Sequence, residues 1–157
     1  MLKLTKKADY GLIALKHLAE SGTSSSAKDI GDEYGLPQEA LAKILQRLTK
    51  SGLLVSQHGT NGGYSLARPA GKISALEVIK AIDGPLFITA CSSHNGECDQ
   101  SSKCNVKEPL RKVNHGIREL LAKISIADMM EAPLPVGAEA ESESKTRISH
   151  SNLVTLA

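Results

Sequence analysis

The stretch that follows Ser26 constrains the fold of this chain more than any other part. Ser26 and Asp29 have the spacing of a helix capping box, with Asp in place of the usual Glu, and they predict a short helix that stops at Gly35. A proline then suits the first turn of a second helix over about residues 37–51, because its missing N–H needs no partner there. Two helices joined by a tight turn at a glycine predict a helix-turn-helix.

A β-hairpin is predicted directly after the second helix. Residues 53–56 and 64–67 are the expected strands, and they flank a turn, Gly59-Thr60-Asn61-Gly62-Gly63, whose residues tolerate positive φ. A hairpin in this position is the wing of a winged helix. Glycines carry no side chain, so the tip of this wing could approach a DNA backbone closely.

Helices are also predicted on both sides of this unit. The first follows a Thr5 cap, another follows Ser74 over residues 75–83, and a long one spans about residues 108–123. The long helix carries an apolar stripe at spacings of three and four residues, made of Leu110, Val113, Ile117, Leu120, Leu121 and Ile124. Such a stripe favours a dimerisation helix, with packing onto its own domain as the alternative. The expected fold is mostly α, a winged helix-turn-helix DNA-binding domain with a long C-terminal dimerisation helix.

The composition agrees with an aliphatic helical core. Hydrophobic residues make up 41% of the 157 residues but aromatic residues only 3%, so Leu, Ile, Val and Ala must fill the interior. We expect a winged helix over residues 1–72, a region with the cysteine loop and dimerisation helix over 73–131, and a disordered tail over 132–157. The sequence shows neither a signal peptide nor an apolar run long enough to span a membrane, which predicts a cytoplasmic protein.

Positive charge gathers around the second helix and the wing. The net charge is only +2, yet residues 38–72 hold five Lys or Arg residues against one Glu. Such a patch is typical of a phosphate-binding surface, although an ordinary solvated helix face would look similar. We expect basic side chains to neutralise phosphates and polar ones to reach base edges. The candidate DNA-contacting residues are Gln38, Glu39, Lys43, Gln46, Arg47 and Lys50 on the helix, and His58, Asn61 and Tyr64 on the wing.

The three cysteines, Cys91, Cys98 and Cys104, lie close together in the sequence. An odd cysteine count without a signal peptide argues against structural disulfides. Clustered thiolates more often bind a soft metal or an iron–sulfur cluster, either [2Fe–2S] or [4Fe–4S]. Zinc is the competing metal, but the gaps of six and five residues are wider than the spacing typical of zinc sites. Three free cysteines are the plainest alternative.

Motifs spread over most of the chain point to one family. They include L-T-K-K-A-D-Y-G, I-G-D-E-Y-G-L-P, the wing G-T-N-G-G-Y-S-L-A-R-P, A-L-E-V-I-K-A-I-D-G-P and the three cysteines. Over about residues 1–131 the chain resembles the Rrf-type winged-helix iron–sulfur transcriptional regulators, the group that contains the repressors IscR and NsrR. The start M-L-K-L-T-K-K-A-D-Y-G and the run G-P-L-F-I-T-A-C resemble most closely the regulator of the SUF iron–sulfur assembly system.

The resemblance implies a homodimer that binds a cluster through three cysteines and one further group, and that controls transcription according to cluster status. NsrR-type proteins use an aspartate from the first helix of the partner subunit, and Asp9 lies near the matching place. IscR-type proteins have a histidine where this chain has Lys107, a poor ligand, so the IscR ligand set does not transfer. Leu110 and His58 stand where many members have tryptophan and arginine.

The fourth ligand can be narrowed to a few residues. Three thiolates leave one iron position for a harder donor, and a weakly held ligand would make the cluster labile, as a sensor requires. Asp9 is favoured on the resemblance to NsrR-type proteins. The other candidates are His94, Glu97, Asp99 and Glu108.

The leading hypothesis is a cluster-responsive transcription factor that binds palindromic double-stranded promoter DNA as a homodimer and regulates SUF cluster-assembly genes. The alternative is an iron–sulfur carrier or redox protein whose winged helix makes protein contacts. An enzyme is less well supported, because the sequence has no G-x-S-x-G, no H-E-x-x-H and no phosphate-cradling loop.

Overall fold

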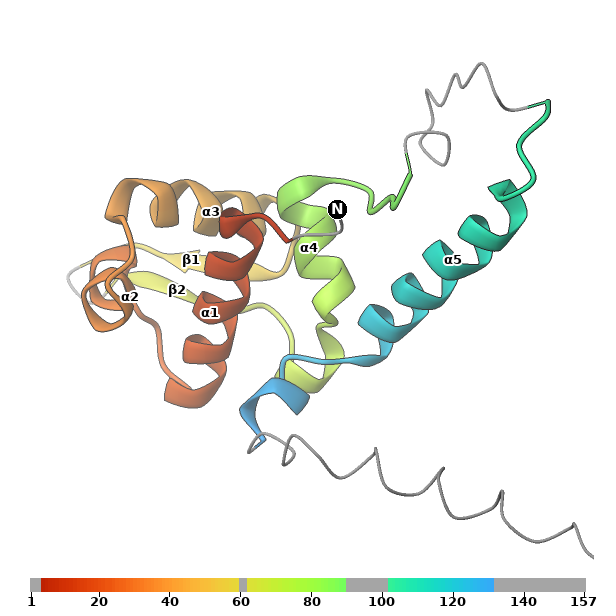
Figure 1. Cartoon of the computed structure of the whole chain (residues 1–157). Coiled ribbons are helices and arrows are strands. Elements are labelled where there is room, and N and C mark those ends of the chain that lie inside the picture. The colour runs from red at the N-terminus through yellow and green to blue at the C-terminus, as the bar shows by residue number, and fades with distance from the viewer. Residues whose placement is uncertain (1–3, 60–61, 90–101, 132–157) are drawn as a thin grey trace, which may run out of the picture.

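The computed structural model describes residues 4–59, 62–89 and 102–131. These residues form a mostly helical body with a two-stranded sheet, from which one long helix extends (Figure 1). This agrees with the predicted winged-helix class; the expected tail lies outside the described residues. The elements in chain order are α1 (Lys6–Ser21), α2 (Ala27–Tyr34), α3 (Gln38–Lys50), β1 (Leu54–Gln57), β2 (Gly63–Leu66), the 3₁₀ turn η1 (Ala70–Lys72), α4 (Ala75–Asp83), α5 (Lys107–Lys123) and the 3₁₀ turn η3 (Asp128–Met130).

Helices α2 and α3 form the predicted helix-turn-helix, and local signals set both ends of α2. The Ser26 hydroxyl and N–H both donate to the Asp29 carboxylate, at 2.7 and 3.1 Å, and these bonds lower the pKa of Asp29. At the other end Gly35 has a φ of 65°, a left-handed conformation that glycine adopts without strain. Gly31 is buried where α2 meets the turn, and an added Cβ would lie 3.2 Å from the carbonyl oxygen of Leu36. A glycine there lets α2 and α3 approach closely.

Strands β1 and β2 form the predicted wing, each shifted by one residue from its expected range. They pair antiparallel, with Gln57 opposite Gly63. The wing is joined to the loop before α2 through Ser25 and Tyr64, because each backbone N–H donates to the other residue's carbonyl, at 3.1 and 2.9 Å. A Cβ on Gly63 would lie 2.7 Å from the Ser25 carbonyl group. Glycine is therefore required at Gly63 by this close approach, and not by the positive φ that the turn sequence suggested.

The core lies between α1, α3 and α4. The predicted inward face of α3 is confirmed, since it is at most 4% exposed; its residues are Leu41, Ile44, Leu45 and Leu48. Helix α4 packs against both α1 and α3, and Gly11 of α1 leaves room for the side chain of Ile82. Ile73 and Ile126, from segments before α4 and after α5, are completely buried in the same core. The body is therefore closed by segments from both halves of the chain.

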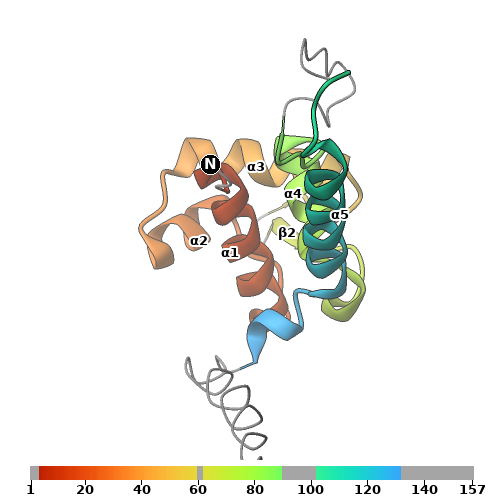
Figure 2. The same cartoon turned by 45° about the vertical axis from the view of Figure 1, so that its right-hand side comes forward.

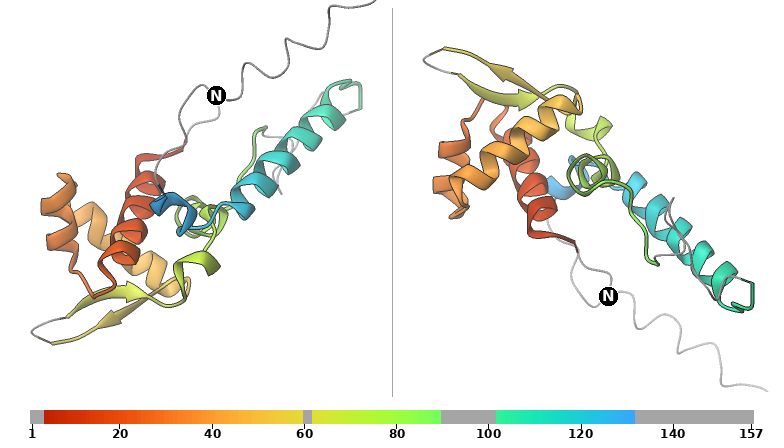
Figure 3. Two further views of the ribbon diagram at one scale, coloured as in Figure 1. Left: turned by 90° about the horizontal axis from the view of Figure 1, so that it is seen from below. Right: turned by 90° about the horizontal axis from the view of Figure 1, so that it is seen from above.

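Helix α5 extends from the body and contacts it mainly through α4 (Figures 1 and 2). After α5 the chain returns to the body, where the Ala75 N–H donates to the Ile124 carbonyl at 2.8 Å and the Ile126 N–H donates to the Ile73 carbonyl at 2.9 Å. The two views of Figure 3 show the same arrangement, with the start of α5 held away from the body and its end attached to it. Among the helices that the structure describes, none is long and apolar enough to cross a membrane.

Candidate DNA interface and cysteine segment

Helix α3 presents one polar line to solvent. Glu39, Lys43, Gln46 and Lys50 follow one another at spacings of four, three and four residues, which places them on one side of the helix. All four are exposed, while the apolar residues of the opposite side are buried in the core. Two lysines and two hydrogen-bonding side chains on an exposed helix face can contact phosphates and base edges.

The wing borders the C-terminal half of this line. A shallow pocket of about 240 Å³ lies between α3 and the two strands, lined by Gln46, Thr49, Lys50, Ser56 and Tyr64. Tyr64 is half-buried and packs against the core, so its ring supports the wing as well as lining the pocket. The structure thus brings together three of the predicted DNA-contacting residues from two elements.

A second groove lies on the other side of the line, between α3, the first turn of α1 and the end of α4. It has a volume of about 550 Å³, and its lining includes Lys7, Glu39, Lys43 and Ile82. Arg47 also lines it but does not follow the outward line, because its Nη1 donates to the carbonyl oxygen of Ile82 at 2.7 Å. This bond satisfies a carbonyl at the end of α4 and ties α3 to α4.

Lys7 was missed by the sequence analysis as a candidate DNA contact. It is exposed in the first turn of α1, and only the tertiary fold brings it to the same groove as Lys43. Its positive charge was the available signal, but charge does not reveal which helix lies beside it. Of the other predicted residues, Gln38 is exposed at the start of α3 and His58 is exposed just after β1, whereas Asn61 lies outside the described residues.

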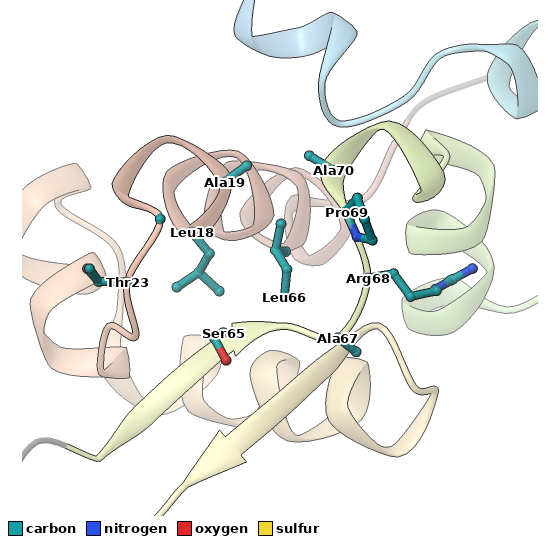
Figure 4. Close-up of a pocket in the computed structure, with 10 residues that line it drawn as sticks. Leu18, Ala19, Thr23, Ser65, Leu66, Ala67, Arg68, Pro69 and Ala70 are labelled. Atoms are coloured by element: carbon teal, nitrogen blue, oxygen red, sulfur yellow. The ribbon is translucent and has the colours of Figure 1, made fainter.

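Arg68, a member of the predicted basic patch, is directed toward α4. Its Nη2 donates to Glu77 Oε1 at 3.0 Å. The pKa of Glu77 is lowered mainly by the backbone N–H of Ser74, which donates to its carboxylate, and further by Arg68. Arg68 also lines a pocket of about 410 Å³ between the end of α1 and β2, where Leu18 and Leu66 lie, but Figure 4 shows its side chain extending away from these leucines. Arg68 therefore stabilises the start of α4 and does not extend the α3 surface.

Helix α5 carries an exposed apolar line. Val106, just before the helix, Val113 and Leu120 are seven residues apart, and their exposed fractions are 50%, 51% and 59%. Leu110 and Ile117 repeat at the same interval beside them and are half-buried. A seven-residue repeat with this alternation is typical of a helix that packs along another helix.

Cys104 is the described member of the three cysteines. It is half-buried, forms no disulfide within the described residues, and lies three residues before α5. Cys91 and Cys98 lie outside the described residues. In the part of the chain that the structure describes, no group of three His, Cys, Asp or Glu residues could hold a metal ion. Asp9 is exposed in the first turn of α1, which Figures 1 to 3 show well separated from the segment before α5. Within one chain, the first turn of α1 therefore does not lie beside the segment before α5.

Comparisons with known proteins agree with this architecture. Residues 4–132 match the model of the Rrf2 family, described as an iron-dependent transcriptional regulator. IscR of T. potens is 32% identical over 82% of this chain and 86% of that chain, with a TM-score of 0.65. CymR, described as the global cysteine regulator of B. subtilis, is 25% identical over 83% of this chain and 97% of that chain, with a TM-score of 0.68. The oxidised form of CymR from S. aureus is 26% identical, covers 85% and 99% of the two chains, and has a TM-score of 0.65.

The family match extends over the helix-turn-helix, the wing and α5, so it includes every described element. It confirms the predicted winged-helix regulator class and the prediction that the chain is not an enzyme. The neighbours named above are IscR and CymR, so the narrower resemblance to the SUF-system regulator stays a proposal. The chain belongs to the Rrf2 family of transcriptional regulators.

Proposed function

We propose that this Rrf2-family regulator senses iron–sulfur cluster status through Cys91, Cys98 and Cys104, and that it controls genes of the SUF cluster-assembly system as a DNA-bound homodimer. The observation that carries the proposal is that a DNA-binding surface and a set of cysteines occur in the same chain. An exposed polar and basic recognition-helix face occurs together with three cysteines in the segment between α4 and α5. The helix face suits DNA, and the thiols are the soft ligands that a cluster needs.

In the DNA complex α3 enters the major groove, which is wide enough for a helix. Gln46 at the centre of the outward line, together with Gln38 and Glu39 at the start of α3, reaches base edges. Lys43 and Lys50 bind phosphates. This division follows from chemistry, because amide and carboxylate groups can read hydrogen-bond patterns whereas an ammonium group acts mainly as a point charge.

Neighbouring elements add backbone contacts. The wing would lie along the DNA backbone or in the minor groove, where His58, and Asn61 from the sequence between the two strands, are proposed contacts; Tyr64 supports the wing from the α3 side. Lys7 places a further positive charge beside the groove that Lys43 borders. Arg47 already donates to a carbonyl of α4, so its contribution to DNA binding is through positioning α3 as well as through its charge.

The exposed apolar line of α5 is the proposed dimer contact. Val106, Val113 and Leu120 keep about half of their surface exposed in the single chain, although together they form a continuous helical repeat. Packing this line against the same line of a second copy removes it from water and generates a two-fold interface. Two recognition helices related by a two-fold axis read a palindromic operator.

The cluster assignment depends on the donor set. The structural neighbours include both IscR and a protein described as a cysteine regulator, so family membership alone does not assign the signal. Three cysteines of one segment would supply three thiolates. Asp9 is our proposed fourth ligand, and because the first turn of α1 lies away from the segment before α5 in the same chain, it would come from the partner subunit of the dimer. A carboxylate binds iron less tightly than thiolate, which suits a cluster that must be lost or altered on demand.

The cluster can be tested with the anaerobically purified dimer. We expect iron and acid-labile sulfide in stoichiometric amounts with visible absorption, and loss of both in Cys104→Ala, while Ser102→Ala serves as the neighbouring control. Asp9→Ala should retain the cluster but lose it faster on exposure to air. Zinc without sulfide, or undiminished iron and sulfide in Cys104→Ala, would overturn the assignment.

The DNA contacts can be tested by fluorescence anisotropy on a SUF promoter fragment and on a scrambled duplex, across a salt series. Lys50→Ala should weaken both complexes equally and reduce the salt slope by roughly one unit. Gln46→Ala should cost about 1–3 kcal/mol on the preferred site and little on the scrambled one. Lys112→Ala, the same charge change on α5, is the control. A cluster carrier would show no salt-dependent preference for promoter DNA, and that result would favour the alternative function.

A further inference from the structure

Asn114 is an exception on α5. Among the residues that the structure describes, Asn114 is the one with a polar side chain that is buried, at 7% exposure. Every other described residue of α5 is half-buried or exposed. A polar side chain is stable in such a position only when its hydrogen-bonding groups have partners. The partner of Asn114 therefore indicates why an asparagine occupies this place.

The Asn114 side chain is bonded to the segment that leaves α4. Its Oδ1 accepts a hydrogen bond from the backbone N–H of Ile88 at 3.1 Å. Residue 88 lies beyond the end of α4 and belongs to none of the helices and strands that the structure describes. A Leu side chain in place of Asn114 would keep a branched side chain of similar length, but it would leave the Ile88 N–H without this acceptor.

The bond joins the two ends of the cysteine segment. Ile88 lies three residues before Cys91, and Asn114 lies ten residues after Cys104 on the helix that follows. Residues before and after the three cysteines are therefore joined by a side-chain hydrogen bond across 26 residues. Figures 1 and 3 show the chain after α4 approaching α5, as this contact requires.

From this geometry we propose that Asn114 is a positioning residue, which holds the residues just before the cysteine segment against α5 and so couples them to the helix bearing the exposed apolar line. The inference rests on the proposed function, because it concerns the same cysteines. It also goes further, since it names the contact through which a change at the cysteines would reach the proposed dimer helix. Loss of the contact should loosen the segment without unfolding the winged helix, whose core lies elsewhere.

The surroundings of Asn114 provide a conservative variant. Arg111, Lys112, His115 and Arg118 line a pocket of about 340 Å³ beside it. A carboxylate at this position would keep an acceptor for the Ile88 N–H, and the nearby charges of Lys112 and Arg118 would offset its burial. Asn114→Asp is therefore the matched control for Asn114→Leu, which keeps a branched side chain of similar length but removes the acceptor. Asn114→Ala, with high helix propensity, repeats the removal without added bulk.

The first measurement is amide hydrogen exchange at Ile88 in the apo full-length chain. We expect exchange to become roughly tenfold faster in Asn114→Leu and Asn114→Ala, which corresponds to about 1.4 kcal/mol for one lost hydrogen bond. Asn114→Asp should restore protection. The midpoint of thermal unfolding should change little in all three variants, because the core of the winged helix lies elsewhere. A merely structural role of Asn114 would instead lower this midpoint and leave the cysteines unaffected.

The second measurement concerns the cysteines themselves. In the holo protein, the rate of cluster loss under air should rise several-fold in Asn114→Leu and return toward the original rate in Asn114→Asp. In the apo protein, the alkylation rates of the three thiols should likewise rise in Asn114→Leu and return toward the original rates in Asn114→Asp. This measurement does not require that the chain can bind a cluster. If the chain holds no cluster, the proposed function is refuted. The alkylation rates of the thiols in the apo protein would still test the role of Asn114. Equal thiol rates in the original chain, Asn114→Leu and Asn114→Asp would overturn the inference.

Discussion

Replacing Leu120 by Ala should weaken the proposed dimer about a hundredfold. The substitution removes about three methyl or methylene groups, each worth about 0.8 kcal/mol when fully buried. Leu120 is 59% exposed in the single chain, so about 1.4 kcal/mol per copy is still to be gained by burial against a partner. A two-fold interface contains the residue twice, which gives about 2.8 kcal/mol, or roughly two decades in the dissociation constant.

Sedimentation equilibrium over a concentration series would measure this dissociation constant directly. Ala is at least as good a helix former as Leu, so α5 should remain helical and the circular dichroism spectrum should be unchanged. The matched control is Leu121→Ala, the same substitution one residue further on, at a half-buried side chain. It should lower the free energy of unfolding more than it weakens the dimer. A Leu120→Ala protein that dimerises within threefold of the original chain would refute the α5 interface.

Two further predictions concern stability. Gly63→Ala should destabilise the wing by about 1–3 kcal/mol in urea unfolding, because the added Cβ would lie 2.7 Å from backbone atoms of Ser25. Gly71→Ala is the control and should be close to neutral, because the nearest atom to its Cβ would be 3.9 Å away. The lowered pKa of Glu77 means that its charged form stabilises the folded state; this contribution is complete above the ordinary pKa of 4.5 and is lost as the pH falls through the lower folded value. Urea midpoints of the original chain and Glu77→Gln should therefore differ at neutral pH and converge under acid conditions, and a constant difference would contradict this role.

Much of the fold could be predicted because its signals are local. The capping pair Ser26 and Asp29, the left-handed Gly35 and the cap at Ser74 each act within about one helical turn. Helix α4 accordingly spans the predicted residues, and the bounds of α3 differ by one residue at each end. The buried face of α3 was also predictable, since its apolar spacing allows only one side to pack.

The candidate site was predictable only in part. The outward line of α3 follows from its periodicity, and its exposure agrees with the prediction. Arg47 has a similar spacing but is bonded to Ile82 of α4, and Lys7 joins the surface from another helix. Both facts depend on how α1, α3 and α4 pack, which no local spacing specifies. The proposed role of Asp9 as a cluster ligand likewise requires a second chain.

The sequence by itself determined which segments are helical or extended, where the helices stop, which face of each helix is apolar, and that three thiols occur close together. These properties follow from caps, glycine conformations and side-chain periodicity, which involve residues a few positions apart. Only the tertiary structure decided that Ile126 completes the core beside Ile73, that Gly63 must pass the backbone of Ser25, and which cations share a surface. It also decided that the segment after α4 is bonded to Asn114 of α5. Such contacts join residues far apart in the chain, so they form only when whole elements pack and bury their apolar faces.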